Sequence, residues 1–237
     1  MMEDKTMKIS STPETWKEIK KCDLFEGIGD SEIEALMDAV NGKVQEYSKH
    51  SVVALEGEEC NRVGIVLRGK VDVRRIHASG KEMTITSLKE GDTFGEVMVF
   101  SDHHKYPSTL YTEAGVKIIQ IPQKDILILC KTSERFLENL IRLLSNKVWM
   151  MNEKLKMLTY QSIKQRIAAY LLEEHWKQES MQIILPHNRQ EMADFLGIPR
   201  PSLSREMANL KKEGLIDYHK SNITLYSVEA LRKINND

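Results

Sequence analysis

The chain has 237 residues, of which 41% are hydrophobic and 29% are charged, and its formal net charge at pH 7 is −1. This composition excludes a disordered or fibrous chain, and the length is sufficient for two globular domains. The near-zero net charge indicates no general attraction to anionic partners, although it does not exclude a local basic face.

The cysteines and the lengths of the apolar runs indicate the cellular compartment. Cys22, Cys60 and Cys130 are scattered without a C-x-x-C pair, so the sequence indicates neither a zinc site nor a disulfide framework. The N-terminus shows no signal-peptide pattern, and no apolar stretch approaches the ~18 residues that a membrane span requires. We therefore expect a cytoplasmic protein with free thiols and no membrane partner.

The first 40 residues are predicted to be helical. A short helix opens at Ser31, and its apolar side chains recur at helical spacing. One face of this helix then carries Ile33, Leu36, Met37 and Val40.

Residues 44–121 change to a β-rich pattern. Short apolar runs such as 63–67 and 71–73 alternate with glycine-containing turns. Strands that repeat at roughly 8–12 residues with such turns indicate an antiparallel sandwich or barrel. We predict an N-terminal domain over residues 1–131 in which helices accompany an antiparallel β-roll.

Residues 133–158 carry an unbroken heptad pattern. A helix of this length extends about 39 Å and would present one apolar stripe to a partner helix. The alternative is a helix that packs on its own β-domain through Phe136, Leu140 and Leu143, and the two arrangements are compatible. The expected dimer stripe consists of Leu137, Ile141, Leu144, Val148, Met151, Leu155 and Leu158.

The helical pattern is interrupted at residues 159–161. Ser162 and Gln165 then form a capping-box pattern that begins another helix. We therefore expect a central dimerisation helix and hinge over residues 132–160, followed by a second domain over 161–237.

Residues 188–212 predict two short helices joined by a tight turn. Asn188 with Glu191 is a second capping-box pattern, and Gly197 ends the helix because glycine takes the left-handed conformation without steric cost. A second amphipathic run follows at once, which is typical of a helix-turn-helix. The alternative is an ordinary helical hairpin in a core. The apolar face of the second helix carries Leu203, Met207 and Leu210.

A predicted β-hairpin follows the second helix of this pair. Residues 214–218 and 223–226 alternate in polarity, and residues 219–222 join them. A hairpin in this place is typical of a winged helix. His219 and Lys220 at its tip either contact phosphate or are solvated turn residues.

In this order, a β-roll, a long heptad helix and a winged helix-turn-helix resemble the Crp/Fnr family of bacterial transcription regulators. Two motifs carry the resemblance, E-G-D-T-F-G-E-V-M-V-F at residues 90–100 and R-Q-E at 189–191 with R-P-S-L-S-R at 200–205. It implies an α+β fold and a homodimer that binds a palindromic operator in double-stranded DNA, with half-sites about 34 Å apart. RNA polymerase is an implied partner, and no enzymatic activity is implied.

The resemblance also assigns DNA contacts. Arg200 and Arg205 are expected to read guanine, and Ser204 another base edge. Pro201 stands where many relatives carry a base-reading glutamate, and Pro199 replaces the usual serine or threonine cap. The expected phosphate contacts are Arg189, Gln190, Ser202 and Lys220.

The effector site departs from the family pattern. Gly95 and Glu96 match the start of the cyclic-nucleotide cassette, where backbone amides at the start of a short helix suit a phosphate. Tyr106 and Pro107 stand where cyclic-nucleotide-binding relatives place arginine and serine, and Lys105 is a poor substitute for that guanidinium. A buried phosphate without a paired cation is costly. The expected effector residues are Gly95, Glu96, Val97, Tyr106, Ser108 and Thr109.

We therefore expect an apolar or aromatic small-molecule effector other than cyclic AMP. Two alternatives remain: a cyclic-nucleotide-responsive regulator with a non-standard cassette, and a constitutive regulator. Gly95 and Glu96 either take part in binding some other ligand or only form a tight turn and a helix cap.

Cofactor and metal sensing are not indicated. Three scattered cysteines do not supply the ligands of an iron–sulfur cluster. His77 beside two arginines is expected on the surface and not on a haem, and His103 and His104 are adjacent loop residues that seldom converge on one ion. The sequence also lacks a nucleophile elbow, paired catalytic carboxylates and a Gly-rich nucleotide loop, so no enzyme is predicted.

Overall fold

The computed structural model describes residues 6–8, 13–76 and 82–236. By contacts within the chain it divides into two compact units, Met1–Ser145 and Asn146–Asp237. The three-part division at residues 131 and 160 stays a prediction. Each unit has its own hydrophobic core.

The N-terminal segment is not entirely helical. Strand β1 (Thr6–Lys8) pairs antiparallel with β2 (Lys43–Tyr47), which corrects the helical prediction for the first residues. The helices that follow are α1 (Pro13–Ile19), the 3-10 helix η1 (Asp23–Phe25) and α2 (Asp30–Asp38).

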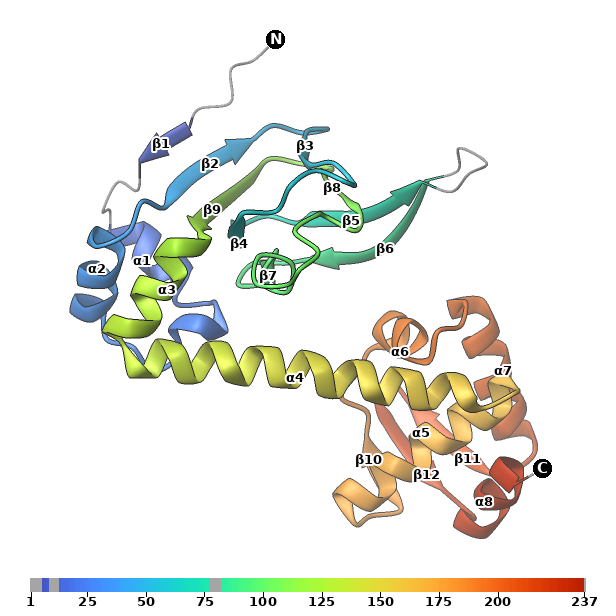
Figure 1. Cartoon of the computed structure of the whole chain (residues 1–237). Helices are drawn as coiled ribbons and strands as arrows, with labels where there is room; N and C mark the ends of the chain where they lie inside the picture. The colour runs from blue at the N-terminus through green and yellow to red at the C-terminus, as the bar shows by residue number, and fades with distance from the viewer. Residues whose placement is uncertain (1–5, 9–12, 77–81, 237) are drawn as a thin grey trace. The chain divides into compact units, whose positions relative to one another are not determined.

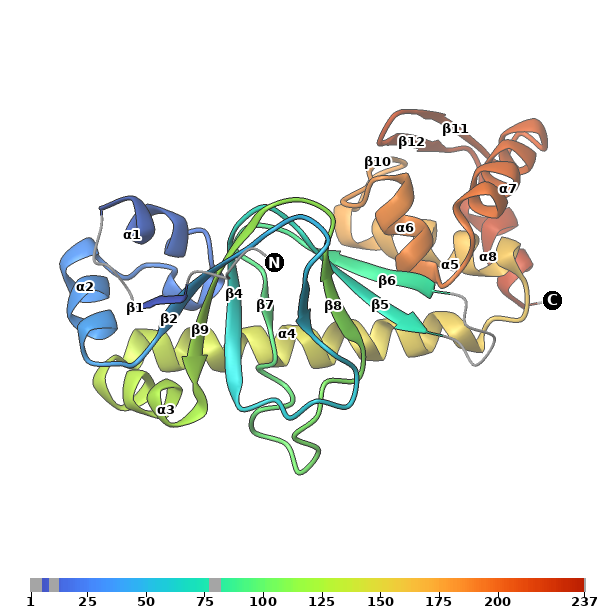
Figure 2. The same ribbon diagram turned by 90° about the horizontal axis from the view of Figure 1, so that it is seen from above.

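Helix α2 confirms the predicted apolar face. Ile33, Leu36 and Met37 are buried in the core, and Val40 is half-buried just beyond the end of the helix. Figures 1 and 2 show α1, α2 and α3 (Gln123–Thr132) together at one end of the β-roll. They close this end of the N-terminal core.

Two antiparallel sheets form the β-roll, as the sequence predicts. One has the strand order β1-β2-β9-β4-β7 and the other β3-β8-β5-β6. The two longest apolar strands, β4 and β9, are neighbours, and their buried side chains include Ile65, Leu67, Ile119 and Ile121. The remaining bounds are β3 (Val52–Ala54), β4 (Arg62–Arg68), β5 (Val71–Ile76), β6 (Glu82–Leu88), β7 (Thr93–Phe94), β8 (Thr109–Thr112) and β9 (Val116–Pro122).

Helix α4 (Glu134–Thr159) is the predicted long helix, with 26 residues. In its first turns Phe136 and Leu140 are buried in the N-terminal core, and the Phe136 ring meets Phe25 edge-on at 5.3 Å. The buried Asn139 amide donates to the carbonyls of Leu24 at 3.1 Å and Glu26 at 2.9 Å. The second apolar stripe therefore packs on the β-domain, as expected.

The C-terminal unit is a winged helix. Its sheet has the order β10-β12-β11, and Figure 2 shows β11 and β12 as a hairpin. The Ser162–Gln165 capping box that begins α5 is present. The elements are α5 (Ile163–Gln178), β10 (Gln182–Ile184), α6 (Arg189–Leu196), α7 (Arg200–Lys212), β11 (Ile216–His219), β12 (Asn222–Leu225) and α8 (Val228–Asn236).

Candidate nucleic-acid interface and effector pocket

Helix α6 begins at a hydrogen-bonded capping box and ends at a glycine. The Asn188 side chain accepts from the amides of Gln190 at 2.9 Å and Glu191 at 3.0 Å, and Glu191 accepts from the Asn188 amide at 2.9 Å. This capping box satisfies amides that have no partner within the helix. Gly197 ends α6 at φ 65°, in the left-handed conformation predicted for it.

Helix α7 has one buried and one exposed face. Leu203, Met207 and Leu210 are buried, as predicted from their spacing. Arg200, Ser204 and Arg205 are exposed and Ser202 is half-buried. Within the described part of the chain, neither exposed arginine forms an ion pair, so both guanidinium groups are available to a partner.

The wing is tighter than predicted. His219 pairs with Asn222 in the β11–β12 ladder, so the turn consists of Lys220 and Ser221 alone. Lys220 has φ 54°, which places it at the tip of a two-residue turn, and its side chain is exposed. His219 is therefore a strand residue and not part of the tip.

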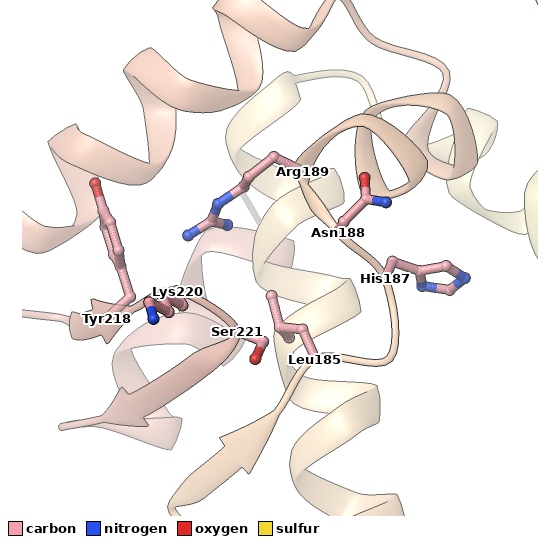
Figure 3. A pocket seen from close by; sticks show the side chains of 7 residues that line it. All are labelled: Leu185, His187, Asn188, Arg189, Tyr218, Lys220 and Ser221. Carbon is pink, nitrogen blue, oxygen red and sulfur yellow. The ribbon is translucent and has the colours of Figure 1, made fainter.

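Arg189 lies in a cavity between the start of α6 and the wing (Figure 3). The cavity has a volume of about 430 Å³. The half-buried guanidinium stands 4.9 Å from the centre of the Tyr218 ring, and burial lowers the pKa of Arg189 from its ordinary value. A desolvated cation over an aromatic face attracts an anion more strongly than an exposed one. The lining residues are Leu185, His187, Asn188, Arg189, Tyr218, Lys220 and Ser221.

The other predicted DNA contacts lie at different places. Lys220 shares the cavity with Arg189, whereas the exposed Gln190 amide donates to Asp194 at 3.0 Å. Sequence reasoning missed Tyr218 and His187 as cavity walls. The sequence could have indicated them only through their position beside residues that were predicted to contact DNA.

The effector residues predicted from the cassette largely meet in one cavity of the β-roll, with a volume of about 180 Å³. Thr109 is outside the lining although its neighbours Ser108 and Leu110 line it, because successive side chains of a strand point to opposite faces, and its hydroxyl accepts from the Glu56 amide at 3.1 Å. The lining residues are Val73, Leu88, Phe94, Gly95, Glu96, Val97, Met98, Tyr106, Pro107, Ser108 and Leu110.

The cassette forms turns in place of the short helix that the resemblance implies. Residues 96–100 are turns, and the Val99 amide donates to the Gly95 carbonyl at 2.9 Å. The expected helix N-terminus for a phosphate is therefore not formed. A second backbone bond, from the Ser101 amide to the Met98 carbonyl at 3.1 Å, follows directly, so the segment forms a tight corner.

The chemistry of the cavity is mainly apolar. Among the lining residues that the structure describes, Glu96 is the one carboxylate, at 4% exposure, and none is a lysine or arginine. The Tyr106 hydroxyl hydrogen-bonds with the Cys60 thiol, and burial raises the pKa of both groups, so both are neutral at pH 7. Outside the lining, the exposed Arg75 guanidinium reaches the Pro107 carbonyl at 3.5 Å.

The predicted dimer stripe on α4 is largely exposed. Ile141 is 56%, Val148 66%, Met151 64% and Leu155 60% exposed, and Leu137 38%. Leu144 differs because it is half-buried against the N-terminal core. The Leu158 side chain lies outside the described residues.

The described residues present neither a metal-ligand cluster nor a membrane-spanning helix. Over the described ranges, no three His, Cys, Asp or Glu side chains are arranged to hold a metal ion, and His103 and His104 are exposed. His77 lies outside the described residues. None of the helices in the described ranges is long and apolar enough to cross a membrane.

Comparisons with known proteins agree with this architecture. The family model "Cyclic nucleotide-binding domain" matches residues 44–133, and "Crp-like helix-turn-helix domain" matches residues 165–234. Together they cover more than half of the chain.

Two curated relatives match this chain over most of their own length. The cAMP-activated global transcriptional regulator CRP of Salmonella typhimurium is 24% identical over 77% of this chain and 89% of its own. The CRP-like cAMP-activated global transcriptional regulator of Mycobacterium tuberculosis is 23% identical over 91% and 97%.

Solved structures share the fold. The Catabolite Activator Protein of Thermus thermophilus has a TM-score of 0.52 at 22% identity, covering 90% of this chain and 98% of its own. A CooA mutant from Carboxydothermus hydrogenoformans has a TM-score of 0.55 at 20% identity, with coverages of 82% and 88%. Fold and domains together define a transcription regulator with a cyclic-nucleotide-binding-like domain and a DNA-binding winged helix. The chain belongs to the Crp/Fnr family.

Proposed function

We propose that this protein is a dimeric regulator that recognises an inverted-repeat operator by inserting α7 of each subunit into a major groove. The observation that carries the proposal is the division of α7 into a buried apolar face and an exposed face with Arg200, Ser204 and Arg205. Arginine pairs bidentately with guanine in the major groove, and serine contacts any base edge. Pro201 occupies the first turn of α7, so base reading depends on the two arginines and Ser204.

Backbone phosphates are bound by a second group of residues. The Arg189 cavity, with Lys220 at its edge, suits a phosphate between the start of α6 and the wing. Ser202 in the first turn of α7 and Gln190 in α6 extend this contact. Such contacts set the register of the protein on DNA without reading sequence.

Dimerisation uses the exposed stripe of α4. This stripe is too apolar to stay in contact with solvent. The heptad spacing of its side chains fits a parallel partner helix. Two reading helices then lie about one DNA turn apart, near 34 Å. The partners we propose are double-stranded DNA, a second copy of the chain and RNA polymerase, and the protein acts by binding and not by catalysis.

The proposed effector is a small apolar or aromatic molecule other than cyclic AMP. The β-roll cavity supplies a buried carboxylate, Glu96, and its described lining residues include no cation to neutralise a phosphate. An unpaired phosphate beside a carboxylate is disfavoured twice, by desolvation and by repulsion. The second candidate is a cyclic nucleotide in a non-standard cassette. It is supported by Arg75, whose guanidinium lies at the Pro107 carbonyl and would have to move from there to the phosphate of the ligand.

The test is selection of random DNA duplexes by the purified protein, with and without cyclic AMP. We expect a two-fold symmetric sequence with half-sites one turn apart, recovered equally under both conditions. Recovery that depends on cyclic AMP would favour the second candidate. The selection is repeated with any apolar compound that binds the β-roll. The DNA-binding proposal fails if no symmetric sequence is recovered under any of these conditions.

A further inference from the structure

A second cavity lies within the C-terminal unit and shares one wall residue, His187, with the Arg189 cavity. Its volume is about 420 Å³, and it is bounded by the later turns of α4, by α5 and by the segment that leads into α6. Helix α4 contributes Trp149, Met150 and Glu153, α5 contributes Tyr170 and Glu173, and Phe195 comes from α6. None of the DNA contacts proposed above lies in its lining.

One wall of this cavity is an aromatic cluster. The Tyr170 ring is 5.6 Å from Phe195, and the His187 ring stacks on Phe195 at 5.3 Å. A hydrogen bond of 2.7 Å between the Tyr170 hydroxyl and His187 Nδ1 fixes these rings relative to each other. Trp149 adds an indole that is 58% exposed. Large rigid aromatic faces supply contact area at a low cost in conformational entropy.

The remaining lining is acidic. Glu153, Glu173 and Glu174 oppose a single ammonium, that of Lys177. Glu174 is buried at 5% exposure and accepts from Lys177 at 2.8 Å. Glu173 pairs with Lys156 outside the lining, while Glu153 is half-buried. The Lys177 ammonium already stands 5.9 Å from the Trp149 ring centre, so this aromatic face accepts a cation.

The cavity does not compete with the proposed dimer stripe. At 3.6 residues per turn, Met150 and Glu153 lie on the side of α4 opposite to Val148, Met151 and Leu155. The cavity therefore stays open when α4 pairs through that stripe.

We propose that this cavity binds a bulky aromatic cation. Its rings stack on the half-buried Phe195, Trp149 contacts its positive charge by a cation–π interaction, and Glu153, the lining carboxylate for which no ion pair is described, supplies the counter-charge. Because Phe195 belongs to α6, such a ligand contacts the first helix of the helix-turn-helix directly. This site is separate from the effector pocket of the β-roll and does not depend on the proposed DNA-binding function.

The test uses two ions of nearly the same shape and opposite charge. Calorimetric titration of the full-length protein with tetraphenylphosphonium is expected to show one site per chain. Tetraphenylborate is expected to bind at least about tenfold more weakly, because like charges across a partly desolvated site repel. Equal binding of both ions, or no binding of tetraphenylphosphonium, would overturn the proposal.

Variants locate the site. Trp149→Leu is expected to weaken tetraphenylphosphonium binding roughly three- to thirtyfold, the range of one cation–π contact. Glu153→Gln is expected to weaken it as well, whereas Glu229→Gln, which removes an exposed carboxylate of α8 outside the lining, leaves it unchanged. Since Trp149 and Glu153 are at least partly exposed, these variants keep the fold. Binding that is insensitive to both of them would place the cation elsewhere and refute this site.

Discussion

At the scale of single residues, Gly95 fixes the corner on which the effector cavity depends. Its φ of 81° lies in the left-handed region, and a Cβ there would stand 2.6 Å from the Arg62 carbonyl oxygen and 3.0 Å from Cys60 Sγ. Both the conformation and the close approach require glycine. The residue is therefore needed structurally whether or not it also binds a ligand.

Gly95→Ala is expected to lower the free energy of unfolding by about 1–3 kcal/mol, which is the cost of a strained backbone conformation. The strain is not relieved by movement, because the close neighbour is the backbone carbonyl of Arg62. Gly115→Ala is the matched control, because a Cβ there would meet only the Tyr47 carbonyl oxygen, at 3.9 Å. Denaturant unfolding measures both. Equal stabilities of the two variants would show that the corner relaxes without cost.

What the sequence predicts at this scale depends on separation along the chain. The capping boxes at Ser162 and Asn188 were predicted because each joins side chains three residues apart. The contact of Arg189 with Tyr218 was not, because the wing brings them together across α6 and α7. Long-range contacts of this kind have no local pattern.

At the scale of elements, α4 serves several neighbours with one sequence. Phe136 and Leu140 pack on the β-domain, Met157 is buried in the C-terminal core, and an exposed apolar stripe that includes Val148 remains. The heptad pattern predicts this stripe, but periodicity alone cannot say which stripe meets which neighbour. The exposed fraction of each side chain distinguishes the packed stripe from the exposed one.

Val148→Asp is expected to break the dimer, because it places a charge in the middle of the helix pair. Val148 is a better position than Leu144, which also packs on the N-terminal core. Asn146→Asp adds the same charge on the opposite side of α4 and serves as the control. Sedimentation should show a monomer for the first variant and a dimer for the second, and a dimer in both would exclude this stripe as the interface.

Two short elements escaped prediction. Strand β1 has only three residues, and its pairing with β2, not its own pattern, makes it a strand. The turn after Gly95 was expected to be helical from the family resemblance. Segments this short carry too little periodicity to compete with tertiary context. Helices α2 and α7, by contrast, were predicted because each buries an apolar face.

At the scale of the whole molecule, a net charge of −1 requires that DNA affinity arise from a few placed cations. The proposed contacts divide into base-reading Arg205 on α7 and phosphate-binding Lys220 on the wing. These two kinds of contact respond differently to salt and to sequence, because only phosphate contacts release counterions without reading bases.

Arg205→Ala is expected to cost about 1–3 kcal/mol per half-site on the selected operator and to relax preference at one base pair in each half. Lys220→Gln is expected to leave the preferred sequence unchanged and to reduce the slope of log affinity against log salt by about two, one phosphate for each subunit of the dimer. Binding to the operator and to single-base variants of it, titrated at several salt concentrations, measures both effects. A shift in sequence preference for Lys220→Gln would show that the wing contacts bases and not the DNA backbone. An equal change in affinity for all sequences for Arg205→Ala would show that this residue of α7 does not read a base. Either result would contradict the assignment of the wing to phosphates and of α7 to bases.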